Sequence, residues 1–161
     1  MSLAERLQLL EHCFQTDTLG YHLSVLKSLF PGGLTVLSIF SGIGGAEVAL
    51  HRLGIHLKRV VSIETSEVKQ RILKSWWHSS GQTGELVQIS DIQSLTINRL
   101  ESLMEKFGTF DFIICQNPCS QSKGSSKMAA SGDRSPSLDF SLYYESVRVI
   151  QRVRDSTERK R

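Results

Sequence analysis

Four short apolar segments alternate with helix-like segments, and this alternation limits the available folds more than any other feature. A strand that is apolar along its whole length must be covered on both faces, as in a parallel sheet between two helical layers. The sequence therefore predicts an α/β sandwich of the doubly wound type with about four strands. The predicted strands are "LTVLSIF" (34–40), "RVVSIE" (59–64), "ELVQIS" (85–90) and "FDFIIC" (110–115).

Helical periodicity fills the intervals between these strands and also precedes the first one. Ser2 and Glu5 have the spacing of a capping box, and a second helix follows Asp17 and stops at Pro31. A polar loop is predicted at 119–137. The predicted organisation has a helical segment packing on the sheet (1–33), an α/β domain (34–154) and a basic tail (155–161). The helices expected within the domain cover 45–53, 66–77, 97–107 and about 138–154.

Composition excludes several classes of protein. The net charge of +3 is too small to imply nucleic-acid binding by itself, and no apolar run is long enough to cross a membrane. Three widely separated cysteines argue for a reducing compartment. The histidines lack metal-ligand spacing, so no metal site is expected.

Chemically suggestive residues follow each predicted strand, at the edge where such folds bind ligands. They are the turn "FSGIGG" (40–45), Glu64 about 20 residues further on, Asp91, and the pair Pro118 and Cys119. Glycines let the backbone approach a ligand closely, and a carboxylate at the second position suits ribose hydroxyls. Taken singly, the turn fits a structural turn and the carboxylates fit helix caps. Taken together, they predict a nucleoside-type ligand.

These residues resemble a known family. "VLSIFSGIGGAEVALHRLGI", "SIE", "SDI" and "NPC" look like motifs of DNA cytosine-5 methyltransferases. With "SWW" and "TFDF", residues 30–154 look more narrowly like the plant domains-rearranged methyltransferases. The resemblance implies a Rossmann-like class I methyltransferase fold that is permuted, with the target-recognition half before the cofactor half. Residues 34–154 would then be a partial methyltransferase domain.

The resemblance also implies a site and a mechanism. Cys119 would be the nucleophile, with Glu64 on the ribose and Asp91 near the adenine of S-adenosylmethionine. A thiolate adding to C6 of a flipped-out cytosine lets C5 attack the cofactor's methyl group. The remaining residues implied to contact the cofactor are Phe40, Ser41, Gly42, Gly44, Gly45 and Pro118.

Two departures from the family leave alternatives open. Cys115, Gln116 and Asn117 stand where active members carry two glycines and a serine, and larger side chains there would crowd the cofactor or the base. The second carboxylate, in a Glu-Asn-Val motif, is not found. "CQNP" resembles the divergent regulatory branch of the family. Cys115 and Cys13 are interpreted as packing residues.

Three hypotheses follow. The first is the cofactor half of an enzyme of de novo, RNA-directed DNA methylation in the nucleus. The second is an inactive paralogue that supports an active methyltransferase or polymerase complex. A third, an unrelated small-molecule methyltransferase, leaves Cys119 unexplained. The implied partners are DNA, through the full-length protein, and a related methyltransferase or silencing-complex subunit in a homo- or heterodimer, with no membrane.

The chain as given is expected to be incomplete. The resemblance places strand one centrally, with strands two and three on one side and strand four on the other. The segment 110–115 would then be an uncovered apolar edge, which attracts other strands. We therefore expect these residues alone neither to methylate DNA nor to form a robust monomer.

Overall fold

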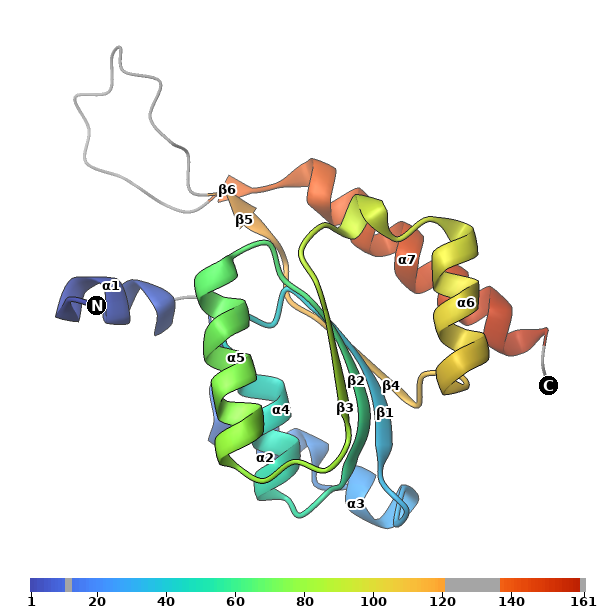
Figure 1. The fold of residues 1–161 in the computed structure, drawn as a ribbon, viewed down its shortest axis with the longest axis horizontal. Helices are drawn as coiled ribbons and strands as arrows, with labels where there is room; N and C mark the ends of the chain where they lie inside the picture. The colour runs from blue at the N-terminus through green and yellow to red at the C-terminus, as the bar shows by residue number, and fades with distance from the viewer. Residues whose placement is uncertain (11–12, 121–136, 160–161) are drawn as a thin grey trace.

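The computed structural model describes residues 1–10, 13–120 and 137–159, with only the backbone described at 119–120 and 137–138 (Figure 1). Its centre is a sheet of four parallel strands in the order β3-β2-β1-β4. The parallel α/β fold and the central place of the first strand are confirmed. The strands are β1 (Leu34–Ile39), β2 (Leu57–Ile63), β3 (Glu85–Ile89) and β4 (Phe112–Cys115).

Helices cover both faces of the sheet (Figure 1). One layer contains α2 (Thr16–Leu23), α3 (Leu26–Leu29), α4 (Gly45–Arg52) and α5 (Glu67–Ser79). The other contains the short 3-10 helix η1 (Ile92–Ser94), α6 (Ile97–Phe107) and α7 (Phe140–Glu158).

β1 is buried along its whole length because it contributes side chains to both layers. Leu34 and Val36 pack in the core under α4, whereas Leu37 and Ile39 pack in the core under α6 and α7. This explains why its sequence is an almost unbroken apolar run.

Side-chain caps fix where several helices begin. The Asp139 carboxylate accepts the Leu142 N–H at 3.1 Å, and the Thr96 hydroxyl accepts the Arg99 N–H at 3.3 Å. The capping box predicted for α1 (Leu3–Leu10) is confirmed. Its two bonds run from the Ser2 N–H to Glu5 Oε2 at 2.6 Å and from the Glu5 N–H to Ser2 Oγ at 3.2 Å.

The structure corrects two details at the ends of the chain. α1 buries no residue, and Leu3 is 71% exposed, so the N-terminal segment packs on the rest through α2 and α3 and not through α1. α7 runs to Glu158, so the first residues of the predicted tail are helical. An ion pair one turn apart supports this extension, with 3.3 Å between Arg154 Nε and Glu158 Oε1.

A small antiparallel ladder, which the sequence analysis placed in a loop, lies beyond β4. It joins β5 (Cys119–Ser120) to β6 (Ser137–Leu138), with Cys119 opposite Leu138. The rest of the predicted loop, 121–136, falls outside the described residues. Within the part that is described, β4 is an edge strand of the main sheet, and no helix has both the length and the apolar character of a membrane span.

Candidate functional site

The turn after β1 begins at a conformationally unusual residue. Phe40 has a φ of 54°, in the left-handed region that residues other than glycine seldom adopt. Its N–H donates to the carbonyl oxygen of Ile63 at 2.8 Å, and its side chain is only 8% exposed. The tertiary structure thus holds a strained residue at the carboxyl edge of the sheet, where folds of this type bind ligands and such strain is common.

Packing inside the protein accounts for two glycines of this turn. A Cβ added at Gly44, where φ is 95°, would lie 2.5 Å from Leu73 Cδ1. A Cβ added at Gly45 would lie 2.9 Å from the carbonyl oxygen of Phe14. Both positions need glycine whether or not a ligand binds. Gly42 also has a positive φ, of 71°, and the cofactor contacts of all three glycines stay predictions.

Glu64 follows β2 and is held firmly. Its N–H donates to the carbonyl oxygen of Ile89 at 3.0 Å, and its Oε1 accepts the Ser66 N–H at 3.1 Å. The Gln70 side-chain amide donates to the Glu64 carbonyl oxygen. With 5% of its surface exposed, Glu64 is a buried carboxylate in a fixed position at the carboxyl end of its strand.

Asp91 has a structural role that the sequence left open. Its Oδ1 accepts the Gln93 N–H at 2.9 Å and so caps η1. The side chain is exposed and does not line the cavity that contains Glu64. Its predicted contact with an adenine stays a prediction.

The segment after β4 is anchored at both ends. The Gln116 N–H donates to the carbonyl oxygen of Ile39 at 3.0 Å, and the carbonyl oxygen of buried Pro118 accepts the Asp139 N–H at 2.8 Å. Cys119 then enters the ladder with Leu138. The backbone of the predicted nucleophile is therefore fixed near the start of α7.

Cys115 is not the packing residue that the sequence suggested, because its side chain is exposed. Partial burial nevertheless raises the pKa of its thiol, and a hydrogen bond with Ser146 offsets this in part. A raised pKa keeps a thiol protonated, so Cys115 is not an activated nucleophile.

One cavity brings several of the predicted residues together. Its volume is about 100 Å³, whereas pockets for ligands of drug size measure roughly 300 Å³ or more. The cavity as it stands is therefore smaller than the pockets that usually hold a ligand the size of S-adenosylmethionine. Gln116 and Asn117 were predicted only as departures from the family pattern. Lys69, in the first turn of α5 and five residues after Glu64, was not predicted. The cavity is lined by Phe40, Glu64, Thr65, Lys69, Gln116, Asn117, Pro118 and Leu142.

Sequence reasoning also missed Glu47, in the first turn of α4. Its side chain is fully buried, and neither carboxylate oxygen makes a hydrogen bond of normal geometry with a described residue. Burial raises the pKa of this carboxyl, although the hydroxyls of Ser38 and Ser41 nearby partly favour the charged form. These two hydroxyls are hydrogen-bonded to each other. Ser41, predicted to contact the cofactor, is thus part of a buried polar group beneath the glycine turn.

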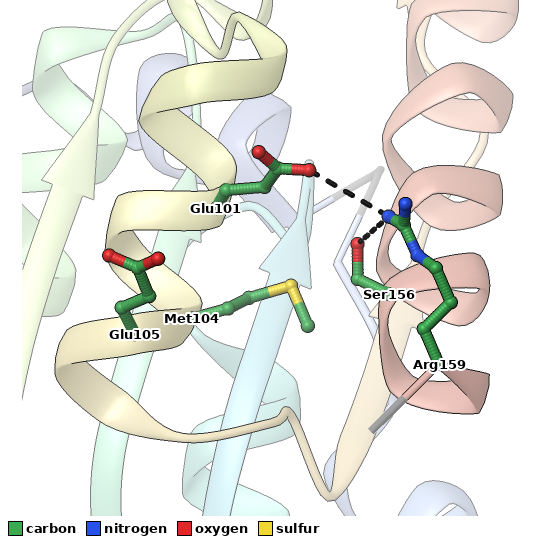
Figure 2. Close-up of a pocket in the computed structure, with 5 residues that line it drawn as sticks. All are labelled: Glu101, Met104, Glu105, Ser156 and Arg159. Atoms are coloured by element: carbon green, nitrogen blue, oxygen red, sulfur yellow. Dashed lines mark hydrogen bonds and ion pairs between the residues drawn. The ribbon is translucent and has the colours of Figure 1, made fainter. Parts of the chain in front are cut away.

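A second cavity, of about 200 Å³, lies between α6 and α7 (Figure 2). Figure 2 shows Glu101 of α6 facing Ser156 of α7 and Arg159, the residue that caps the end of α7, with 3.7 Å between Arg159 Nη2 and Glu101 Oε1. Arg152 also pairs with Glu101, at 2.8 Å. None of the predicted site residues lines this cavity, so it is a crevice bridged by ion pairs between two helices.

Comparison with known proteins identifies the family. The family model for C-5 cytosine-specific DNA methylases matches residues 34–155, which is most of the chain. The chain belongs to this family. Its members use S-adenosylmethionine as the methyl donor, and the predicted resemblance is confirmed.

Plant proteins match nearly the whole chain. It is 63% identical over 153 residues to the "Probable inactive DNA (cytosine-5)-methyltransferase DRM3" of Arabidopsis thaliana, covering 95% of this chain and 21% of that protein. It is 50% identical over 157 residues to the "DNA (cytosine-5)-methyltransferase DRM2" of the same plant, covering 96% and 24%. A rice protein (Oryza sativa subsp. japonica) named as a probable inactive DRM3 is 49% identical over 150 residues, covering 93% and 21%. The chain thus spans about a fifth to a quarter of the length of these relatives.

Proposed function

We propose that this chain is the cofactor-side half of a domains-rearranged-type protein that supports an active DNA cytosine-5 methyltransferase and does not transfer the methyl group itself. The observation that carries the proposal is the small cavity in which Gln116 and Asn117 share the space with Phe40 and Glu64. The 63% identity to a relative named as probable inactive supports it.

The physical reason lies in the geometry that methyl transfer requires. Transfer needs the methyl donor, the base and the thiolate of Cys119 to be held in contact at once, because positioning supplies much of the rate. The cavity, at about 100 Å³, is smaller than the pockets that usually hold ligands of the donor's size. The described part of the sheet, by contrast, has a buried apolar core on each of its faces.

An apolar stripe on α7 supports the partner-binding role. Its residues recur at helical spacing on the side opposite buried Val149 and Val153, and two of them are strongly exposed, Phe140 at 65% and Tyr144 at 68%. Exposed aromatic side chains in a row favour a protein interface. We assign this surface to contact with a related methyltransferase chain. The α7 stripe consists of Phe140, Tyr143, Tyr144 and Val147.

A second candidate is the enzyme itself, acting in de novo, RNA-directed DNA methylation in the nucleus. It is favoured by the retention of Cys119 on an anchored backbone and by the 50% identity to a relative named as a DNA (cytosine-5)-methyltransferase. In that case Cys119 is indispensable, because covalent activation of C6 has no substitute.

The test uses the full-length protein, duplex DNA, labelled S-adenosylmethionine and an active relative. We expect the full-length protein alone to transfer no methyl groups and to increase transfer by the active relative. The Cys119→Ala variant should increase methyl transfer by the active relative as much as the wild type does. The control variant Cys13→Ala should do the same. Transfer by the wild type alone that Cys119→Ala abolishes would establish the enzyme and exclude the regulatory function.

The α7 stripe gives a separate prediction. Tyr144→Asp places a charge in the stripe and should abolish both co-purification with the active relative and the increase in its activity, because a charge at the centre of an apolar contact must be desolvated. Tyr21→Asp is the matched control, since Tyr21 is an exposed tyrosine on α2. If both variants bind the relative as the wild type does, the partner contacts another surface.

A further inference from the structure

We propose that the side chain of Gln116 is the element that closes the cofactor pocket to S-adenosylmethionine. The inference rests on the proposed function, because it gives a structural reason why this chain would not load a methyl donor. According to this inference one side chain closes the pocket, and we expect its truncation to open the pocket.

Most walls of the cavity cannot move aside. Phe40 belongs to the core under α6 and α7, and Leu142 packs against that core. The carboxylate of Glu64 is held by the Ser66 N–H, and Pro118 is buried. Exposed Thr65 lies on the solvent side. The space available to a ligand therefore depends on the remaining lining residues, which are the long side chain of Lys69 and the segment at 116–117.

The backbone of this segment is fixed beside the cavity that Gln116 lines. The Gln116 N–H is bonded to the carbonyl oxygen of Ile39, and two residues later Pro118 is tied to Asp139 at the start of α7. A ligand cannot push the segment away without breaking these hydrogen bonds. It would have to displace the side chain itself.

The amide oxygen of Gln116 is buried, although the residue as a whole is half-buried. Its Oε1 is buried and has no hydrogen-bond partner among the described residues. A buried acceptor without a partner costs free energy, which a side chain at an open pocket would avoid by turning toward water. The buried position of this oxygen is therefore set by the packing around Gln116 and not by a hydrogen bond.

The test is calorimetric titration of S-adenosylmethionine and S-adenosylhomocysteine into the full-length protein. Gln116→Ala removes the amide and most of the side chain, and we expect it to lower Kd about tenfold, the order expected when an overpacked contact is relieved. Gln116→Met keeps a similar length without the amide and should bind no better than the wild type. Adding Glu64→Ala to Gln116→Ala should remove the gain, because both ligands carry the ribose. The thermal unfolding midpoint of each variant without ligand serves as the control for folding.

The outcomes separate this inference from the proposed function. Equal Kd values for Gln116→Ala and the wild type, or weaker binding by Gln116→Ala, would overturn the inference. A gain with Gln116→Met as large as with Gln116→Ala would also overturn it, because the amide and not the occupied volume would then control binding. The Cys119→Ala comparison measures transfer and stimulation without reference to Gln116, so the regulatory function can survive the failure of this inference.

Discussion

Gly84→Ala is expected to lower the free energy of unfolding by about 3 kcal/mol. A Cβ at this position would lie 1.9 Å from the carbonyl oxygen of Leu57 and 2.6 Å from that of Lys58, both on the backbone of β2. A backbone clash cannot be relieved by a change of rotamer, so β3 must move away from β2. The ladder that begins with Arg59 opposite Glu85 would be lost first.

Urea unfolding of the full-length protein, followed by circular dichroism, measures this effect. Gly20→Ala is the matched control, since Gly20 lies within α2 and nothing lies within 4 Å of an added Cβ. Alanine should stabilise that helix by about 0.5–1 kcal/mol. If Gly84→Ala unfolds at the same urea concentration as the wild type, the approach of β3 to β2 is wrong.

Glu47→Gln is expected to stabilise the protein at pH 7 by more than about 1 kcal/mol and to flatten the dependence of its stability on pH. Burial raises the pKa of the Glu47 carboxyl above the ordinary value of 4.5. Above pH 4.5 the unfolded chain loses this proton before the folded protein does, so the free energy of unfolding falls as the pH rises toward the folded pKa. At lower pH both the folded and the unfolded chain keep the Glu47 proton, so this loss of stability does not occur. Glutamine has no proton to lose and avoids the penalty.

The measurement is the free energy of unfolding between pH 4 and pH 8 for both proteins. Glu67→Gln, at an exposed glutamate in the first turn of α5, is the control and should leave the profile unchanged. Parallel profiles for Glu47→Gln and the wild type would mean that the Glu47 carboxylate is charged and paired in the folded protein.

Local rules explain what the sequence determined. Strand and helix are encoded in the spacing of apolar residues within a few positions, and caps such as the one between Ser2 and Glu5 act within a single turn. Three of the predicted site residues, Phe40, Glu64 and Pro118, line one cavity because parallel strands bring their carboxyl ends to one edge. Element order, sheet class and the approximate site thus follow from sequence alone.

Contacts between distant segments decided the rest. Gly45 is needed because the backbone of Phe14 lies against it, which no pattern within the turn reveals. The burial of Glu47 without a hydrogen-bond partner depends on how α4 docks on β1. The enclosure of Gln116 depends on where β1 and α7 hold its backbone. The spacing of residues in the sequence predicts which of them lie at the same edge of the sheet. Only packing in three dimensions fixes how much space remains between them. At this site that space decides whether a cofactor fits.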